Sequence, residues 1–430
     1  MSKTLARIAL IRHLFALALL ACLSACGGGG SPSSLVNPLA SNQTQILVDG
    51  GPASLKINGF NGVPNAPYVT LTICAPGSIT NCQTVDHIIM DTGSVGLRIQ
   101  AQALNAYMLA ALPVQTDASS RNIGECYQYV EGYVWGSVRS ADLTIGGETS
   151  GSMPMQVIGD NLAPVPTACA SSGGTSDNSI AAFNANGIIG IGTNPTDCGT
   201  LCSNGTIGSA GYPYYACTGT GSSATCVQTA QGASTGAPNQ QLPNPVSTFA
   251  VDNNGTLISM PSVPSGGQAN LTGTLTFGIG TRTNNGLGSA NIVPASIYTG
   301  YIVTLFDGYT LANSYVDSGT SVYTFNDGKV PYCTSGTYAG FYCPPSPLTL
   351  SAINVGQNGL YNNVSFTVSN PSSMNLSYSV LPQMAVVASA FGQAIPTAFA
   401  WGFPFFYGRN VYTAIAGAST PGGTGPYFAY

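Results

Sequence analysis

The sequence predicts a mainly β protein built from two similar halves, and three observations lead to this prediction. The chain of 430 residues contains 54 glycines and 28 prolines, which favour turns over long helices. Short runs rich in β-branched and aromatic residues recur along it, with little helical periodicity. The same kind of turn follows an apolar strand at residues 88–94 and again at 315–320. A chain of this length is sufficient for two lobes.

The first 25 residues (1–25) have the pattern of a secretory signal peptide. Lys3, Arg7 and Arg12 precede an apolar stretch over residues 14–21, and small residues follow it. We therefore expect this segment to be removed and the mature protein to work outside the cytoplasm.

Leu23-Ser24-Ala25-Cys26 resembles the lipobox of bacterial lipoproteins. This resemblance implies that Cys26 carries a lipid that attaches the mature chain to a membrane; a secretory leader without lipid is the alternative. Residues 26–43 begin with a run rich in Gly and Ser, which predicts a flexible tether. Gly27 stands where an Asp would retain such a lipoprotein at the inner membrane. The expected location is therefore the outer membrane of a Gram-negative bacterium.

The cysteine content agrees with export to an oxidising compartment. Of twelve cysteines, ten remain when Cys22 in the signal and the lipidated Cys26 are set aside. A zinc site at Cys198 and Cys202 is disfavoured, because the chain after the signal has one histidine and no second close thiol pair nearby. Spacing does not fix the connectivity, so pairing between neighbours in the chain is the simplest hypothesis. The expected bridges are Cys74/Cys82, Cys126/Cys169, Cys198/Cys202, Cys217/Cys226 and Cys333/Cys343.

Charged residues are scarce, at 6% of the sequence. Without Lys3, Arg7 and Arg12 the chain has seven basic and fifteen acidic residues, which gives a net charge of −8. Such a surface repels phosphate backbones, so nucleic acid is not an expected partner. We expect a monomer with neither a cofactor nor a metal ion.

The predicted strands fall into two lobes, at about 44–252 and 253–430. Each lobe contains short runs in which β-forming residues alternate with polar ones and end at turn residues. The clearest of these runs lie at 68–73, 143–145, 273–277 and 411–415.

Three segments have a second interpretation. Residues 193–243 are low in complexity and rich in Gly, Ser, Thr and Gln, which predicts a surface insertion. Within them, residues 232–236 match the G-x-S-x-G pattern of serine hydrolases, but no apolar strand precedes them and His87 is the one histidine after the signal. Residues 384–406 are apolar and long enough to span a bilayer. Two prolines and two glycines interrupt them, so buried strands are the better prediction.

The feature most informative about function occurs once in each half. In each half, an apolar strand ends in an Asp-(Thr/Ser)-Gly-(Ser/Thr) turn, and a glycine follows at a similar distance. Gly190 lies 99 residues after the first Asp, and Gly402 lies 85 residues after the second. Each glycine follows two large or apolar residues, which indicates a duplicated unit. Two ordinary Asp-Gly turns of a β-sandwich are the alternative. The two turns are Asp91-Thr92-Gly93-Ser94 and Asp317-Ser318-Gly319-Thr320.

At these residues the chain resembles the pepsin-like aspartic peptidases, and the resemblance covers both halves. It implies a bilobal, mainly β fold with lobes related by a pseudo-twofold axis, in which each Asp turn and its partner glycine form a ψ-shaped loop. Residues 273–278 look like the opening strand of the second lobe, and residues 401–412 resemble the segment after the last glycine. The chain is also similar to a bacterial family of lipoproteins without an assigned function.

The resemblance implies the chemistry of the site. Asp91 and Asp317 would form the catalytic pair, because two carboxylates held close together share one proton. One carboxylate then acts as a base towards a water molecule, and the other acts as an acid towards the scissile carbonyl.

The other residues of the two turns would support this pair. Thr92 and Ser318 would join the turns by hydrogen bonds, and Gly93 and Gly319 would let the backbone turn tightly. The outer oxygens of the two carboxylates would accept hydrogen bonds from Ser94 and Thr320.

The same family has a hairpin, called the flap, whose Tyr closes over the substrate. Residues 129–136 lie where this hairpin is expected, and Tyr129 aligns best with that Tyr, in competition with Tyr127 and Tyr133. Arg98 is a departure, because it stands where the family often has Trp. The subsite beside the flap is therefore expected to differ.

The leading hypothesis is a lipid-anchored aspartic endopeptidase that acts on peptide or protein substrates. The main alternative is a lipoprotein that keeps the fold and binds peptides without cleaving them, but it gives no reason to keep both Asp91 and Asp317. A structural outer-membrane protein would fit the aromatic end at 426–430, yet it leaves the paired motifs unexplained.

Overall fold

A computed structural model describes residues 39–57, 62–130, 132–171, 174–199, 202, 213–230, 241–388 and 397–430. The predicted signal peptide, Cys26, most of the tether and the G-x-S-x-G segment lie outside the described residues. Residues 39–430 form one compact unit. No helix among the described residues is both long enough and apolar enough to cross a membrane.

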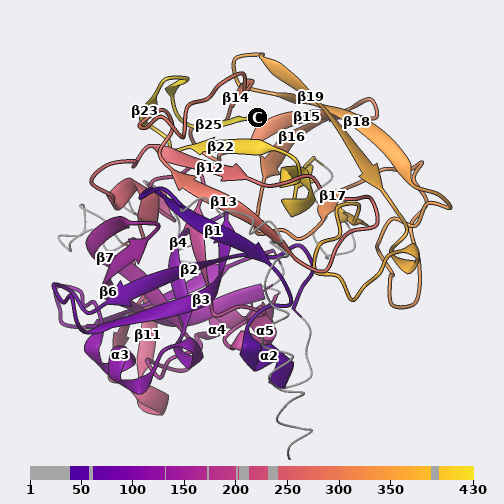
Figure 1. The fold of residues 1–430 in the computed structure, drawn as a ribbon. Coiled ribbons are helices and arrows are strands. Elements are labelled where there is room, and N and C mark those ends of the chain that lie inside the picture. The colour runs from indigo at the N-terminus through magenta and orange to yellow at the C-terminus, as the bar shows by residue number, and fades with distance from the viewer. Residues whose placement is uncertain are drawn as a thin grey trace, which may run out of the picture. The chain divides into compact units, whose positions relative to one another are not determined.

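The described residues are mainly β, which confirms the predicted fold class. Most of their strands belong to a 16-stranded sheet that continues from the first half of the chain into the second (Figure 1). Its path runs in the order β11 (Thr225–Gln228), β10 (Tyr214–Thr218), β5 (Asn122–Gln128), β6 (Gly132–Ile145), β7 (Glu148–Ile158), β4 (Val95–Gln100), β9 (Gly187–Ile191), β3 (Cys82–Asp91), β2 (Pro67–Cys74), β1 (Gln43–Val48), β13 (Leu271–Phe277), β12 (Gly255–Ser259), β22 (Asn410–Ala414), β25 (Tyr427–Ala429) and β14 (Ile292–Pro294), with β8 (Thr175–Ser176) beside β6.

A second sheet belongs to the C-terminal half alone. It has seven described strands in the order β19 (Tyr361–Val368), β18 (Leu348–Val355), β15 (Ile302–Phe306), β16 (Tyr309–Val316), β21 (Ala400–Trp401), β17 (Tyr323–Phe325) and β20 (Ala385–Val387). The described part of the chain also has a small hairpin of β23 (Ser419–Thr420) and β24 (Gly423–Thr424), and short α-helices α2 (Ala53–Ile57), α3 (Ala106–Ala111), α4 (Thr167–Ala170) and α5 (Ile180–Phe183). Single 3-10 turns lie at Ala101–Ala103, Gly221–Ser223, Pro245–Thr248, Pro371–Ser373 and Phe403–Phe406.

Strand β1 joins the two halves. It pairs antiparallel with β13 from Gln43 opposite Thr276 to Val48 opposite Leu271, and its end also pairs with β2. Figure 1 shows β1 in indigo beside the much later strand β13. The first described strand is therefore an integral part of a sheet that includes the start of the predicted second lobe.

The same arrangement of three strands occurs in each half. In the first, β3 and β9 are parallel with Asp91 opposite Gly190, and β4 returns antiparallel to β9. In the second, β16 and β21 are parallel, the Asp317 amide donates to the Trp401 carbonyl, and β17 returns antiparallel to β21. Each Asp therefore lies at the end of a strand, and the two strands have the same arrangement of neighbouring strands.

The glycine of each arrangement is required by a close approach of backbone. A Cβ atom at Gly190 would lie 2.5 Å from the Val95 amide nitrogen. A Cβ atom at Gly402 would overlap the Val322 carbonyl oxygen. Any side chain would thus push the returning strand away from the strand that leads into the glycine.

Aromatic rings fill the space behind the second Asp turn. Phe399 and Trp401 are fully buried and stack with ring centroids 4.1 Å apart, and Phe399 also stacks on Phe325 at 4.8 Å. Large buried rings contribute both apolar area and stacking, so they hold the very short strand β21 in place.

Five disulfides join the ten cysteines, each between neighbours in the chain. The pairs are Cys74–Cys82, Cys126–Cys169, Cys198–Cys202, Cys217–Cys226 and Cys333–Cys343, as the nearest-neighbour hypothesis predicts. Cys198 and Cys202 are therefore bonded to each other rather than available as zinc ligands.

The predicted insertion at 193–243 contributes to the sheet where it is described. Strand β10 pairs with β5, and Tyr214 and Ala216 are buried between this strand and the rest of the lobe. The low-complexity composition indicated a surface segment, but the aromatic and small residues at 214–217 supply an apolar edge that packs on β5. The lobe boundaries themselves remain a prediction.

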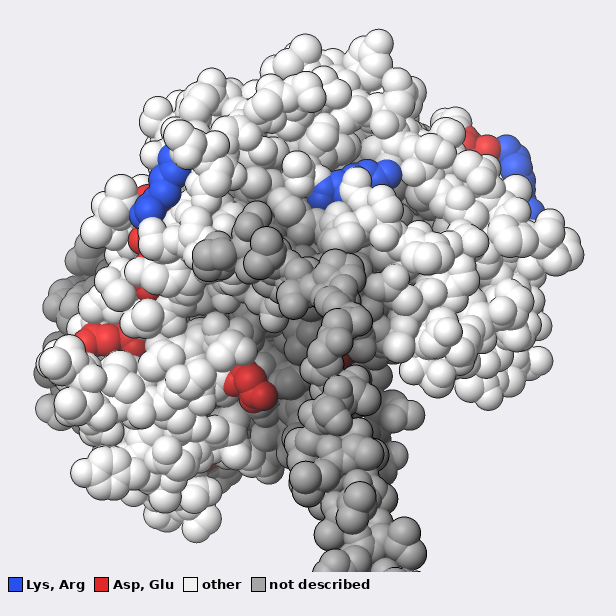
Figure 2. Space-filling view, viewed as in Figure 1, with Lys and Arg blue, Asp and Glu red and all other residues white. Residues whose placement is uncertain are grey.

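The surface follows the composition. Figure 2 shows a mostly uncharged face with a few separated basic and acidic side chains. Several of the remaining charges are buried instead, and one such cluster lies beside the site described below.

We predict that Gly402→Ala destabilises the protein by about 1–3 kcal/mol, because a methyl group overlaps the Val322 carbonyl and forces β17 outward. Urea unfolding gives the free energy of unfolding. Gly328→Ala is the matched control, since nothing lies within 4 Å of its added Cβ, and it should stay within about 0.5 kcal/mol of the wild type. Equal effects of the two changes would contradict this account of Gly402.

Candidate active site

The two Asp turns are joined by a reciprocal set of buried hydrogen bonds. The Thr92 amide donates to Ser318 Oγ at 3.0 Å, and the Ser318 amide donates to Thr92 Oγ1 at 2.9 Å. Each hydroxyl then donates to the carbonyl of the residue directly before the opposite turn. Thr92 Oγ1 donates to the Val316 carbonyl at 3.0 Å, and Ser318 Oγ donates to the Met90 carbonyl at 2.8 Å. The two halves of the chain are thereby locked together directly beneath the carboxylates.

Each carboxylate also receives hydrogen bonds from its own turn. Ser94 Oγ donates to Asp91 Oδ2, and the Gly93 amide donates to Asp91 Oδ1 at 2.7 Å. In the second turn, Thr320 Oγ1 donates to Asp317 Oδ2 at 2.7 Å. The Gly319 and Thr320 amides donate to Asp317 Oδ1 at 2.8 and 3.1 Å. These donors fix the plane of each carboxyl group.

The glycine of each turn faces the opposite carboxyl group. A Cβ atom at Gly93 would lie 2.5 Å from Asp317 Cγ, and one at Gly319 would lie 2.6 Å from Asp91 Oδ1. Neither glycine has a positive φ, so the tight turn expected from the sequence is not what requires them. The requirement is space, because the two carboxyl groups come together across the two turns.

The two carboxyl groups are unequal in burial, because Asp91 is buried and Asp317 is partly exposed. Asp91 is buried and its pKa is well above the usual range, first because burial disfavours the charged form and then because of the charge of Asp317 and a hydrogen bond to it. The hydrogen bonds from Ser94 and Gly93 act in the opposite direction but do not cancel this. Asp91 therefore holds a proton more tightly than an isolated carboxyl group does.

A cleft of about 550 Å³ opens over the pair. This volume is in the range of binding sites for small ligands and short peptide segments. The described residues that line it are mostly apolar or aromatic, and none of them is Lys, Arg or His. Its aromatic lining consists of Tyr68, Tyr127, Tyr129, Phe183, Tyr301 and Tyr315, and its acidic residues are Asp91, Asp177 and Asp317.

The predicted flap residue lies at the tip of a hairpin beside this cleft. Strands β5 and β6 pair antiparallel, and the Tyr129 amide donates to the Gly132 carbonyl at 2.8 Å across the turn. Tyr129 lines the cleft, and its buried hydroxyl has no hydrogen-bond partner among the described residues. Tyr127 lines the cleft as well, whereas Tyr133 is buried away from it. The structure therefore favours Tyr129 and Tyr127 over Tyr133.

Several cleft residues were not identified from the sequence. Tyr315 lies on β16, two residues before Asp317, which directly follows this strand. Side chains two residues apart on a strand face the same side, and this period would have identified Tyr315 as a cleft residue. Phe183 and Tyr301 come from a short helix and a connecting segment, and no sequence pattern links them to the Asp turns.

The histidine nearest to the first Asp turn lies outside the site. His87 contacts Asp49 and Asp86, and its ring packs edge-on against Tyr68. These contacts join β3, which carries His87 and Asp86, to Asp49 directly after β1. Among the described residues, no group of three or more His, Cys, Asp or Glu side chains is arranged to hold a metal ion.

Comparisons with known proteins place the chain in a family. Residues 38–430 match the model of a family described as "Protein of unknown function (DUF3443)". The chain belongs to this family. No curated protein matches the sequence. Among solved structures, a similar one is the aspartic proteinase from Irpex lacteus, with 13% identity, coverage of 90% of this chain and 96% of that chain, and a TM-score of 0.47. The family description assigns no reaction, so a functional conclusion depends on the geometry of the site.

We predict that Thr92→Val lowers the free energy of unfolding by about 1–3 kcal/mol, because it leaves the buried Ser318 amide and Val316 carbonyl without their partner. Thr92→Ser keeps the hydroxyl and is the matched control. Urea unfolding compares the two variants, and a loss in Thr92→Ser as large as that in Thr92→Val would show that the hydroxyl is not what matters.

We also predict a pH dependence of stability that originates at Asp91. Its pKa is raised on folding from about 3.9, so the folded state holds the proton more tightly than the unfolded state. The resulting stabilisation is complete below pH about 4 and is lost as pH rises towards the raised pKa. Thermal unfolding from pH 4 to 8 should show a shallower decline for Asp91→Asn than for the wild type. Asp307→Asn, remote from the cleft, should keep the wild-type decline.

Proposed function

We propose that this protein is an aspartic endopeptidase that hydrolyses peptide bonds with a water molecule activated by Asp91 and Asp317. The observation that carries the proposal is the mutual fit of the two turns, in which each glycine leaves room for the opposite carboxyl group. A pair of ordinary Asp-Gly turns has no reason to meet in this way, to be joined by reciprocal hydrogen bonds, and to open onto a cleft.

The reaction follows from the unequal carboxyl groups. A water molecule between them would lose a proton to Asp317 as its oxygen attacks the scissile carbonyl carbon, while Asp91 would give its proton to the carbonyl oxygen. When the C–N bond of the resulting tetrahedral intermediate breaks, Asp317 would return its proton to the leaving nitrogen and Asp91 would regain one from a hydroxyl. Both groups are then back in their starting states.

The cleft supports a peptide as the substrate. Its aromatic lining suits large apolar side chains of a substrate. The described lining residues include no basic side chain, which disfavours a phosphorylated or strongly acidic substrate. The Tyr129 hydroxyl has no hydrogen-bond partner among the described residues, so it would be available to a peptide group of the substrate. The hairpin tip would thus contribute to binding.

The location of this activity is proposed from the sequence alone. Residues 1–26 have the pattern of a lipoprotein signal, so we propose that the enzyme is anchored through Cys26 and acts on peptides or proteins outside the cytoplasm.

We predict that Asp91→Asn and Asp317→Asn each reduce cleavage of a denatured protein substrate at least about 10³-fold, because Asn cannot carry the shared proton. Since the two groups act as a unit, the double variant should be little worse than either single variant. Cleavage by the wild type should be fastest below neutral pH, where the pair holds one proton, and should fail where both groups are ionised. Mass spectrometry of the products from pH 3 to 8 measures this.

The control variant is Asp307→Asn, a surface carboxylate outside the cleft, which should retain wild-type activity. Full activity in either dyad variant would refute the assignment of the catalyst. If the wild type binds a statine-type peptide inhibitor but cleaves no substrate at any pH, the peptide-binding lipoprotein becomes the better function.

A further inference from the structure

A buried cluster of charged residues lies directly behind the wall of the cleft. The Arg98 guanidinium on β4 donates from Nε and Nη2 to the Glu125 carboxylate at 3.2 and 2.6 Å, and from Nη2 to Asp197 Oδ2 at 3.0 Å. Its Nη1 donates to the Val95 carbonyl at 2.7 Å. All three charged side chains have zero exposure to solvent. A two-pronged contact with Glu125 fixes both the position and the plane of the guanidinium.

The face of this guanidinium carries a residue of the cleft. Arg98 Cζ lies 3.7 Å from the centroid of the Tyr127 ring, which is a cation–π contact within a desolvated environment. Tyr127 lines the cleft, and its ring packs 4.9 Å from that of Tyr129 at the hairpin tip. One buried cation thus supports both aromatic residues of the hairpin that face the two aspartates.

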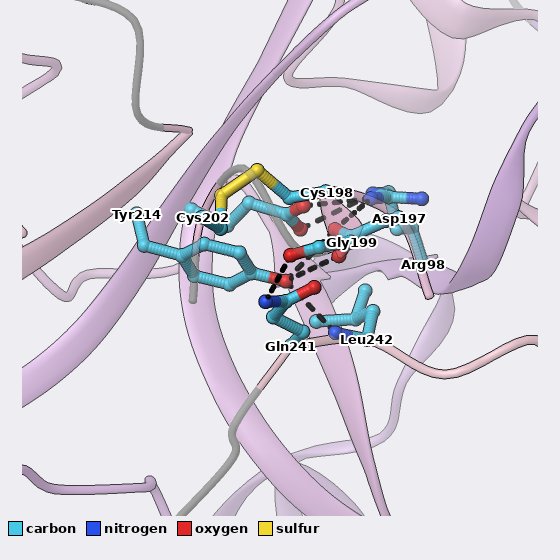
Figure 3. Close-up of a disulfide and its surroundings, with 9 residues drawn as sticks. Arg98, Asp197, Cys198, Gly199, Cys202, Tyr214, Gln241 and Leu242 are labelled. Atoms are coloured by element: carbon cyan, nitrogen blue, oxygen red, sulfur yellow. Dashed lines mark hydrogen bonds and ion pairs between the residues drawn. A yellow bond between two sulfur atoms is a disulfide. The ribbon is translucent and has the colours of Figure 1, made fainter. Parts of the chain in front are cut away.

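The far side of the cluster is attached to the segment that follows the first ψ-shaped loop. The Tyr214 hydroxyl donates to Asp197 Oδ2 at 2.8 Å and accepts from the Leu242 amide at 2.8 Å. Gln241 Nε2 donates to the Gly199 carbonyl at 2.9 Å, and the Cys198–Cys202 disulfide lies beside Asp197 (Figure 3). Asp197 is therefore held from several directions, and it in turn holds Arg98.

The charge balance of the cluster argues against a purely stabilising role. Two carboxylates share one cation, and the pKa of Asp197 is well above its usual range, first because of burial and next because of Glu125, with Arg98 and Tyr214 acting in the opposite direction. Replacement of buried ion pairs by apolar residues is often neutral or stabilising. What this cluster supplies in particular is a fixed direction for the guanidinium under Tyr127.

We propose that Arg98 is a positioning residue of the cleft, which acts through the Tyr127 ring to hold the hairpin tip, residues 127–130, over Asp91 and Asp317. This proposal rests on the proposed peptidase function. Arg98 has no access to the substrate, so its effect on the reaction is transmitted by the ring and the hairpin. Arg98, which stands where the related peptidases often have Trp, would thereby have a specific role in this chain, the support of the Tyr127 ring.

The decisive variant is Arg98→Lys, which keeps the positive charge but loses the planar fork and the stacking surface. The extended substrate still contacts the rest of the cleft, so KM should change less than three-fold. Misplacement of the hairpin over the scissile bond should lower kcat by about 10-fold to 100-fold. Arg139→Lys is the matched control, because Arg139 forms a partly buried ion pair with Asp160 but has no hydrogen bond or ion pair with a cleft residue. It should leave kcat and KM within two-fold of the wild type.

A second readout does not depend on activity. Hydrogen exchange followed by mass spectrometry on the full chain should show amides of residues 122–130 exchanging at least ten-fold faster in Arg98→Lys, and at the wild-type rate in Arg139→Lys. If the wild type cleaves nothing, the proposed function fails, but this exchange difference still decides whether Arg98 positions the hairpin. Equal exchange in the two variants, or unchanged exchange in Arg98→Lys, would overturn the proposal.

Variants of Tyr127 test the same link without changing the charged cluster. Tyr127→Phe keeps the ring face, so amides of residues 122–130 should exchange at the wild-type rate, whereas Tyr127→Leu removes the cation–π contact and should reproduce the faster exchange and the loss of kcat seen in Arg98→Lys. If Arg98→Lys does not fold, this pair of variants decides the question alone. A Tyr127→Leu protein with wild-type kcat and wild-type exchange would refute the proposal.

Discussion

The reciprocal hydrogen bonds between Thr92 and Ser318 are the constraint on which the site depends. They lie in a buried position, where an unmade hydrogen bond is expensive, and each hydroxyl serves as both donor and acceptor. Because neither turn can satisfy its own backbone groups, each turn requires the other. The close approach of the two carboxyl groups is a consequence of this mutual requirement, and the energetic penalty of bringing two acids together is offset by contacts that only the assembled pair provides.

The buried carboxylates of the first half follow a common physical rule. The side chains of Asp91 and Asp197 are both buried, each lies next to a second carboxyl group, and each has a raised pKa as a result. They differ in what surrounds them. Asp91 opens onto a cleft where a reactant can take up or supply the proton, whereas Asp197 is enclosed by Arg98, Glu125 and Tyr214. Under the two proposals, the same combination of burial and a neighbouring carboxyl group would serve a reaction at Asp91 and a rigid support at Asp197.

Sequence reasoning was most successful where the residue type is dictated by local geometry. A strand that ends in Asp-Thr-Gly or Asp-Ser-Gly, followed by a distant glycine, indicates the ψ-shaped loops because only glycine tolerates the approach of the returning strand. It also indicated the cysteine pairs, since neighbours in the chain are also neighbours in space here. For the flap tyrosine the sequence left three candidates, because the length of the hairpin, and with it the pairing register of its two strands, does not follow from the sequence.

Other features could not be predicted because they depend on contacts between distant segments. Glu125 and Asp197 are 72 residues apart, and nothing in either local sequence shows that one guanidinium lies between them. From the sequence, Arg98 stood out only because it stands where the family often has Trp, and its buried position became visible in the structure, where all six residues of its strand are buried. The strand at Tyr214–Thr218, within the predicted insertion, could not be predicted because the composition of residues 193–243 is low in complexity.

The pairing of β1 with β13 has a consequence for the order in which the chain folds. The partners are more than 220 residues apart, so most of β1 has no partner strand until β13, in the second half of the chain, has been delivered. Contacts of such high sequence separation slow folding, since a long loop must be closed before they form. During that interval the edge of β1 that will pair with β13 remains unpaired. A chain that follows this route is therefore most vulnerable to misassociation and proteolysis at an early stage, before its two halves have met.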